Sequence, residues 1–297
     1  MAAFSAVNDA HLEERIRALT QTARLADGRE LPVLPFFFVQ DLARALARSR
    51  TREKHPRGQA VAHVERVALA LGVCPERYLR NHDAYSLVEQ LRLLESGAAL
   101  VGLGGLGGYV LELLARAGVG RVRAADGDEF VPTNLNRQLY ATRRSLGGYK
   151  AAAAAARLRL VNPAVDFEPM AVYLEEADML KFFQGAQLCL DALGGLADRA
   201  ALLRQAGQAG LPVVTAGVAG ASGFVATVLP GEKGPADYFG AGAGAEDSQG
   251  TPAPAVATAA SLMAAEALSV LCGRGPRLAG KMLVFDLNQM SFETLTL

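Results

Sequence analysis

Short apolar runs alternate with longer amphipathic stretches along the chain from about residue 77 onward. The apolar runs predict buried strands at residues 98–101, 120–125, 166–172, 187–190 and 212–216. The stretches between them show helical spacing of apolar residues, at 109–117, 149–160, 175–183 and 196–209. This order predicts an α/β fold, with a Rossmann-like, mostly parallel sheet covered by helices on both faces.

The pattern changes towards the C-terminus. Residues 224–229 predict a further strand, and residues 281–287 and 291–296 predict a closing hairpin of antiparallel strands. The intervening residues 230–252 form a long Gly/Pro/Ala loop, and a loop of this length in a compact domain is more often functional or mobile than filler. A helix is expected at 255–271, where Glu266 interrupts the apolar run and favours a buried helix over a membrane span.

Residues 1–76 differ from the rest and predict a helical N-terminal extension to a nucleotide-binding domain at 77–297. Helical patterns at 12–26, 39–47 and 60–71 are separated by prolines, and residues 48–57 form a basic link. A DNA-binding helical pair is the alternative, but the basic charge is local. We therefore expect an arm that packs on the main domain or on a partner.

The composition narrows the class of protein. Thirty basic residues balance thirty acidic ones over 297 residues, so neither a nucleic-acid nor a membrane partner is expected. Charged residues interrupt the N-terminal segment, so no signal peptide is predicted. The three cysteines, Cys74, Cys189 and Cys272, form no C-x-x-C pair, which favours a reduced, cytoplasmic protein. No histidine follows His82, so the main domain cannot build a histidine-based triad or metal site.

A glycine-rich loop stands between the first predicted strand of the main domain and its helix. Gly102, Gly104 and Gly107 fit the G-x-G-x-x-G pattern, and Gly105 lies within it. Without Cβ atoms the backbone can approach a phosphate at the helix N-terminus. Asp126 ends the next strand, where a carboxylate can accept hydrogen bonds from ribose hydroxyls. These features fit NAD and ATP equally.

The segment after Asp126 favours ATP. Arg137 can bind phosphate oxygens through its forked guanidinium, and Lys150 supplies a point charge near a helix start. Asp128 can orient a metal ion or its water. A diphosphate is handled mainly by backbone amides, whereas a triphosphate with a leaving pyrophosphate needs fixed cations. An NAD-binding protein stays a less favoured alternative.

Together these residues resemble a known family. The motifs on which the resemblance rests are Arg77-Tyr-Leu-Arg80, Gly102–Gly107, Ala117-Gly-Val-Gly120, Asp126-Gly-Asp128, Asn134-Leu-Asn-Arg-Gln138, Gly148-Tyr-Lys150 and Asp191 with Arg199. With these motifs, residues 77–297 resemble the ubiquitin-activating-type adenylyltransferases, the ThiF, MoeB and HesA proteins. The HesA-like bacterial branch looks most similar.

The resemblance implies an activity, partners and residue roles. Such proteins bind Mg-ATP, adenylate the C-terminal Gly-Gly carboxylate of a ubiquitin-like sulfur-carrier protein, release pyrophosphate, and are usually homodimers. Asp126 would hold the ribose, and Arg80 would reach the phosphates in the neighbouring subunit. The residues implied around the phosphates are Asn134, Arg137, Gln138 and Lys150.

The sequence departs from the family pattern after the fourth strand. Gly194 and Gly195 replace an Asp-Asn pair whose Asp is the family's Mg²⁺ ligand. Asp128 is the tentative metal ligand that remains, and Asp198 could compensate but more readily caps or pairs on a helix surface. The loss motivates an alternative function, a catalytically impaired module that binds nucleotide or a carrier.

Cysteine positions set two further expectations. The two C-x-x-C pairs that hold structural zinc in many family members are missing, so no zinc is expected. The loop at 230–252 also lacks a cysteine nucleophile, so the reaction should stop at the acyl-adenylate.

Overall fold

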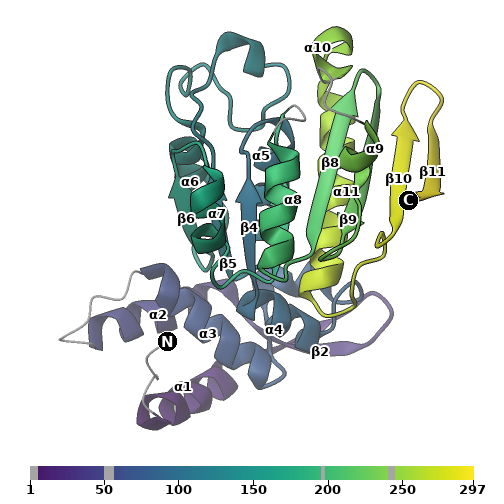
Figure 1. Cartoon of the computed structure of the whole chain (residues 1–297). Helices are drawn as coiled ribbons and strands as arrows, with labels where there is room; N and C mark the ends of the chain where they lie inside the picture. The colour runs from purple at the N-terminus through teal and green to yellow at the C-terminus, as the bar shows by residue number, and fades with distance from the viewer. Residues whose placement is uncertain (1–5, 50–56, 195–197, 240–244) are drawn as a thin grey trace.

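The computed structural model describes residues 6–49, 57–194, 198–239 and 245–297 (Figure 1). Its main domain is built on one eight-stranded sheet with the strand order β11-β10-β9-β8-β7-β4-β5-β6. Strands β4 to β8 run parallel, while β9, β10 and β11 are antiparallel to their neighbours. The strands are β4 (Gly97–Val101), β5 (Arg121–Ala125), β6 (Asp166–Met170), β7 (Leu188–Asp191), β8 (Val213–Ala219), β9 (Ser222–Val228), β10 (Lys281–Asp286) and β11 (Ser291–Thr296).

Helices cover both faces of this sheet, which confirms the predicted fold class. On one face, α5, α6 and α11 enclose the largest apolar core, and on the other α7 and α8 enclose a second (Figure 1). The helices are α4 (Leu87–Glu95), α5 (Gly105–Ala117), α6 (Lys150–Val161), α7 (Glu176–Phe182), α8 (Arg199–Gln208), α9 (Pro235–Phe239), α10 (Ala245–Gln249) and α11 (Ala253–Leu271). Two short 3-10 helices, η1 (Glu76–Asn81) and η2 (Pro132–Asn134), connect them.

Helix α11 is long and apolar enough to cross a membrane, but 61% of its apolar window is buried inside the fold. It packs on α5, β8 and β9. Its one carboxylate, Glu266, is buried and accepts hydrogen bonds from the Thr227 hydroxyl and from the backbone N–H groups of Arg277 and Leu278. These bonds satisfy the carboxylate, so the helix packs as a core element, as the sequence predicted.

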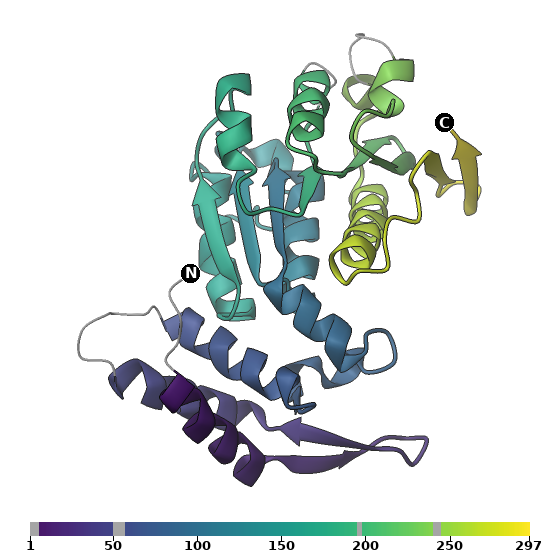
Figure 2. The ribbon, with the colours of Figure 1, turned by 60° about the horizontal axis from the view of Figure 1, so that its bottom comes forward.

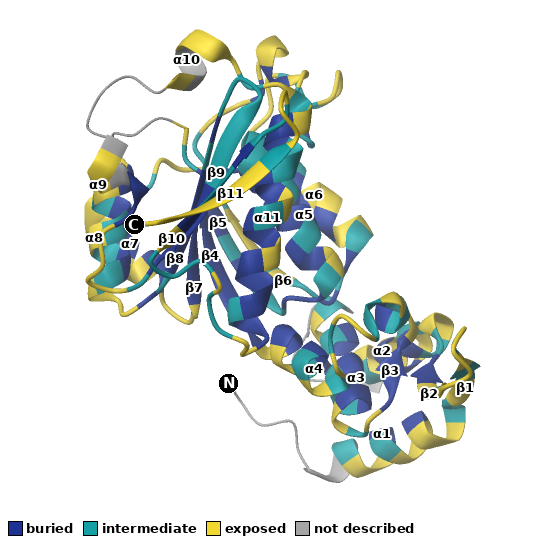
Figure 3. Cartoon of the chain, turned by 90° about the vertical axis from the view of Figure 1, so that its right-hand side faces the viewer, coloured by how far each residue is buried: buried dark blue, intermediate teal, exposed yellow. Residues whose placement is uncertain are grey.

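The N-terminal extension has an apolar core of its own beneath the main domain (Figures 2 and 3). It contains a strand pair that the sequence analysis did not predict. The helix expected at 12–26 ends at Leu19, and the next residues pair with β2 around a turn in which Gly28 has φ +86°. The extension is therefore not purely helical. Its elements are α1 (Ala6–Leu19), β1 (Gln21–Arg24), β2 (Glu30–Leu34), α2 (Phe36–Ser49), α3 (Arg57–Ala70) and β3 (Cys74–Pro75).

A buried polar network joins the extension to the main domain. Glu65 of α3 is fully buried, pairs with Arg77 at 2.8 Å and accepts a hydrogen bond from the Tyr78 hydroxyl at 3.0 Å. Asn162, after α6, donates to Tyr78 and to the carbonyl of Ala115 in α5. Burial raises the pKa of Glu65, and the Arg77 charge opposes that rise. Paired buried groups of this kind fix how the two parts pack.

Candidate nucleotide-binding site

The glycine loop lies where the chain reverses its direction of travel across the sheet. Strand β4 is flanked by β5 on one side and β7 on the other, and such a switch point leaves a crevice at the carboxyl ends of parallel strands. Gly102 has φ +95°, and a Cβ there would lie 2.5 Å from the carbonyl oxygen of Ala192 after β7. A Cβ on Gly107 would collide with the carbonyl oxygen of Gly102. Both glycines are required by close backbone approach.

Gly104 and Gly105 form the open rim of the loop. Gly104 is the N-cap of α5 and supplies no side-chain cap, so the first N–H groups of the helix can receive an anion. A Cβ on Gly104 would lie 3.4 Å from Gln138 Nε2 and 4.0 Å from Lys150 Nζ. A Cβ on Gly105 would lie 3.8 Å from Arg137 Cγ. The fold therefore brings these three predicted phosphate-binding residues to the rim of the glycine loop.

Asp126 is fixed at the carboxyl end of β5 by backbone donors. Its Oδ2 accepts from Leu103 N–H at 2.7 Å and its Oδ1 from Asp128 N–H at 2.9 Å. The side chain is only 8% exposed. Each carboxylate oxygen has two lone-pair sites, so ribose hydroxyls can still donate to this group.

Asp128 lies between a cation and a hydroxyl. Lys150 Nζ contacts Asp128 Oδ2 at 2.6 Å and lies 3.7 Å from Asp126 Oδ2, while the Tyr173 hydroxyl donates to Asp128 Oδ1 at 2.6 Å. Burial alone would raise the pKa of Asp128, but the hydrogen bonds from Lys150 and Tyr173 outweigh it and hold that pKa below its usual value. Tyr173 was not predicted from the sequence, because the contact joins residues from two different strand ends.

Gln138 offers an unpaired polar atom. Its side chain is buried, with 7% exposed, and among the described residues its Oε1 has no hydrogen-bond partner. A buried unsatisfied oxygen costs free energy unless a ligand or water completes it. Because the other end of the same amide faces Gly104, the glycine loop is the place where a ligand can supply that partner.

Asn134 and Arg137 bond within their own loop. Asn134 is buried and its Oδ1 accepts from Val131 N–H, a bond that shapes η2. Arg137 donates to the carbonyl of Thr133 and to Asn136 Oδ1, both at 2.9 Å. Arg137 would therefore exchange these exposed partners for phosphate. The role of Asn134 at the phosphates stays a prediction.

Arg80 is not brought to the other predicted site residues within this chain. It is exposed and lies in η1, where its neighbour Tyr78 contacts the position of Gly118 at the C-terminal end of α5. The glycine loop is at the opposite end of that helix. A role for Arg80 at a nucleotide thus depends on a second subunit.

A buried ion pair lies at the end of β7. Arg199 contacts Asp191 at 3.0 Å, and Thr215 donates to the same Asp191 oxygen at 2.7 Å. Asp198 is exposed at the N-cap of α8 without a side-chain capping bond. Gly194 is exposed, and a Cβ added to it would meet no atom of the described residues within 4 Å.

These donors do not by themselves fit Mg²⁺. Both oxygens of Asp128 are engaged, and Asp191 serves the ion pair with Arg199. The described part of the chain holds no group of three or more His, Cys, Asp or Glu side chains that could bind a metal. Asp128 therefore stays a tentative ligand that would have to release a partner to bind the ion.

The cysteines are buried, as expected of packed thiols. Burial raises the pKa of the Cys74 thiol to about 11 and that of Cys189 well above its usual value. Neither thiol has the lowered pKa of a nucleophile.

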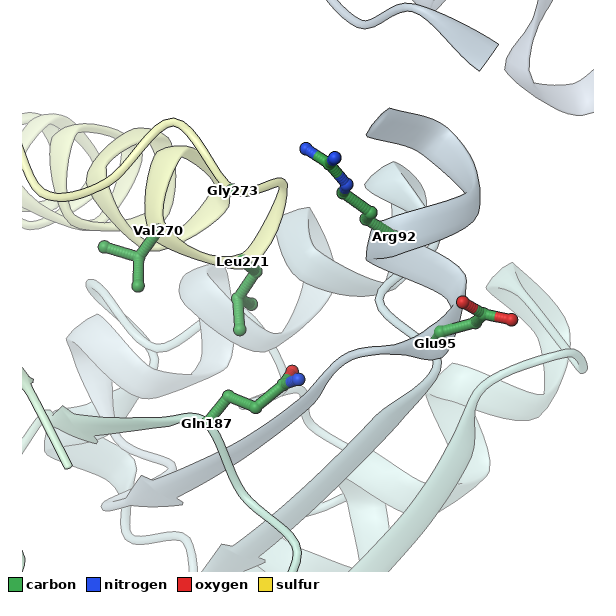
Figure 4. A pocket seen from close by; sticks show the side chains of 6 residues that line it. All are labelled: Arg92, Glu95, Gln187, Val270, Leu271 and Gly273. Atoms are coloured by element: carbon green, nitrogen blue, oxygen red, sulfur yellow. The ribbon is translucent and has the colours of Figure 1, made fainter. Parts of the chain in front are cut away.

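A separate pocket of about 370 Å³ opens at the C-terminal end of α11, lined by Arg92, Glu95, Gln187, Val270, Leu271 and Gly273 (Figure 4). It contains none of the predicted site residues.

Comparisons with known proteins agree with this geometry. The sulfur carrier protein adenylyltransferase of Thermus thermophilus is 36% identical over 219 residues, which cover 70% of this chain and 80% of that protein. The molybdopterin-synthase adenylyltransferase of Escherichia coli is 30% identical over 214 residues, covering 70% and 86%. These names support the prediction of an adenylyltransferase enzyme.

Solved structures show the same fold. E. coli MccB with ATP matches with a TM-score of 0.65 at 18% identity, over 94% of this chain and 95% of that one. The microcin C7 biosynthetic enzyme MccB in complex with N-formylated MccA matches with a TM-score of 0.64 over the same shares. The ThiF family model matches residues 78–297. The chain therefore belongs to the ThiF family, as its motifs predicted.

Proposed function

We propose that this protein is an ATP-dependent adenylyltransferase that activates the C-terminal Gly-Gly carboxylate of a ubiquitin-like sulfur-carrier protein as an acyl-adenylate. The observation that carries the proposal is the convergence of Gln138, Arg137 and Lys150 on the rim of the glycine loop in a ThiF-family chain. An uncapped helix N-terminus, two cations and an unpaired amide oxygen suit a triphosphate. For a dinucleotide's diphosphate the two cations would have no role.

The reaction asks for positioning and charge neutralisation rather than acid–base chemistry. A carrier carboxylate is already ionised, so its oxygen attacks the α-phosphorus of ATP, a new P–O bond forms, and the α–β bridge breaks to release pyrophosphate. Lys150, Arg137 and the α5 N–H groups would neutralise the charge that builds on the phosphates. Asp126 would orient the ribose. The lack of histidine after His82 is therefore no obstacle.

The direct test is product formation. Purified protein is incubated with ATP, Mg²⁺ and a candidate carrier, and the carrier is weighed by intact-mass spectrometry. The proposal expects a carrier heavier by one adenylyl group, which is AMP less one water, and a carrier lacking its final glycine should stay unmodified. Folded protein that leaves every cognate carrier unmodified would contradict it.

A catalytically impaired module is the second candidate function, favoured by Gly194. Because a Cβ at that position would meet no atom of the described residues within 4 Å, Gly194→Asp can be made to restore the family's carboxylate. If the native chain is impaired, this substitution should create or strongly raise adenylation. If adenylation is already robust and does not change, the impaired function is excluded.

The sulfur-carrier partner is a proposal, and the structural match over the N-terminal extension suggests a second class of partner. The structural match to MccB covers more of the chain than the ThiF match does, and MccB has been solved with the peptide MccA. A peptide carboxylate is therefore an alternative substrate to a sulfur carrier. The same mass measurement distinguishes them, because each partner is weighed separately.

The assembly and the cellular location are proposals too. We expect a cytoplasmic homodimer in which Arg80 of one subunit serves the other, since Arg80 is exposed and far from its own glycine loop. Mixing Arg80→Ala with Lys150→Ala subunits tests this. If Arg80 acts across the interface, the mixture should regain about a quarter of wild-type activity. Random pairing makes half of the dimers mixed, and in each mixed dimer both defects fall in one active site and leave the other site intact.

A further inference from the structure

Tyr173 is held in a fixed position although its ring is exposed. The residue follows β6 and is 74% exposed, so apolar packing does not explain its placement. Its hydroxyl donates to Asp128 Oδ1 at 2.6 Å. A Cβ on Gly127 would lie 2.7 Å from Tyr173 Cδ2 and 2.8 Å from Tyr173 N. The glycine of the Asp126-Gly-Asp128 motif therefore makes room for Tyr173 to reach Asp128.

Asp128 connects this hydroxyl to the lysine of the site. Lys150 Nζ bonds the other oxygen of the same carboxylate at 2.6 Å, and the lysine side chain is 8% exposed. Tyr173 and Lys150 thus bind opposite oxygens of one carboxylate, which fixes its plane. The ammonium has three N–H donors, so it can keep its bond to Asp128 and still donate to a phosphate at the rim of the glycine loop.

Without Asp128, the carboxylate that still contacts the lysine would be Asp126, which lies 3.7 Å from Nζ. The four-carbon stem of the lysine is flexible, and ordering it only when a ligand binds would cost affinity. Because its plane is fixed, the Asp128 carboxylate holds the Lys150 ammonium in one position, next to Gly104. The bond to Asp128 therefore explains the position of this exposed tyrosine, which neither core packing nor solubility explains.

We propose that Tyr173 is a positioning residue that holds Lys150, through Asp128, in place for the phosphates of the nucleotide. The inference rests on the proposed function, because it takes ATP as the ligand of the glycine loop. No motif of the sequence points to Tyr173. The assignment comes from the contact between the ends of β5 and β6.

The test compares two exposed tyrosines that lie near Lys150 in this site. Tyr173→Phe removes only the hydroxyl that binds Asp128. Tyr149→Phe is the matched control, because Tyr149 is 47% exposed, precedes Lys150 directly, and its hydroxyl makes no hydrogen bond to the described residues. ATP affinity is measured by titration calorimetry without any partner protein, and thermal unfolding is followed for each variant.

Tyr173→Phe should weaken ATP binding about three- to tenfold, in the range of one ordinary hydrogen bond, because the hydroxyl acts on the lysine only through Asp128; the unfolding temperature should change little. Tyr149→Phe should bind ATP within about twofold of wild type, as expected when no hydrogen bond is lost. In the Asp128→Ala background, adding Tyr173→Phe should have no further effect, because the hydroxyl acts through that carboxylate.

Three results would overturn the proposal alone while wild-type protein binds ATP. They are unchanged affinity in Tyr173→Phe, equal weakening in both phenylalanine variants, and an undiminished effect of Tyr173→Phe in the Asp128→Ala background. Wild-type protein that folds and binds no ATP would overturn the proposed function, and this inference with it.

Discussion

Arg199 and Asp191 form a buried ion pair, 3.0 Å apart, at the C-terminal end of β7. Arg199 also donates to Thr215 and to the carbonyls of Leu193 and Ala216. The ion pair thus ties the end of β7 to the middle of β8. Asp191 and Arg199, which the chain shares with the family motif, therefore have a structural role that does not depend on the residue at position 194.

Arg199→Met should lower the free energy of unfolding by about 3–5 kcal/mol, because it leaves the Asp191 carboxylate buried without its cation. Arg204→Met is the control on the same helix, since Arg204 pairs with Glu176 at the surface. That exposed pair should contribute about 0–1 kcal/mol. Urea unfolding measures both, and similar losses in the two variants would contradict the account of Asp191.

Gly107→Ala should destabilise the protein by about 1–3 kcal/mol or prevent folding, because the added methyl group collides with the Gly102 carbonyl. Gly194→Ala meets nothing within 4 Å and should change stability by less than about 0.5 kcal/mol. Thermal unfolding compares the two. A well-folded Gly107→Ala protein of wild-type stability would show that the loop is not packed as described.

Two buried glutamines should respond in opposite ways to leucine. Gln138→Leu removes the unpaired Oε1, so stability should hold or rise while ATP affinity falls about fivefold, the value of one ordinary hydrogen bond. Gln90 instead donates to the Ala117 carbonyl and accepts from Asn81, far from the glycine loop. Gln90→Leu should lose stability and bind ATP normally. Equal ATP affinity in wild type and Gln138→Leu would remove Gln138 from the site.

Acid should weaken the fold through Glu89. Hydrogen bonds from the Arg274 side chain and the Ser86 backbone lower the pKa of Glu89 to about 2 from 4.5. An acid with a lowered pKa stabilises the native state above its unfolded pKa, and this stabilisation is lost as the pH falls through the interval between the two values. As the pH is lowered, urea unfolding should therefore show a smaller loss of the free energy of unfolding in Glu89→Gln than in wild type. Parallel pH profiles would contradict the assignment.

Much of the main domain could be predicted because its strands are short, apolar and buried on both faces. The run from Ala98 to Val101 is fully buried, and burial of that kind leaves a clear pattern in sequence. The glycine loop could be predicted for the same physical reason that it exists, since the backbone at Gly102 and Gly107 leaves no room for a side chain.

The features that could not be predicted depend on contacts between distant residues or on weak local patterns. The strand at 21–24 is mostly exposed, and the strand at 30–34 is buried only at its last two residues, so neither shows a clear apolar alternation. The helical pattern at 12–26 also runs into the first strand and hides the turn at Gly28. The bond from Tyr173 to Asp128 spans 45 residues and joins two strand ends. Sequence spacing placed Lys150 near the phosphates but gave no sign that Asp128 and Tyr173 hold it.

The most direct test of the central claim is carrier-dependent exchange of pyrophosphate into ATP. The account predicts exchange that requires the carrier's C-terminal Gly-Gly, and that falls at least about 100-fold in Lys150→Ala, as expected when a charge aimed at the reacting phosphates is removed. The same variant should remain folded. No exchange by folded wild-type protein with its cognate carrier, or full exchange in Lys150→Ala, would contradict the account.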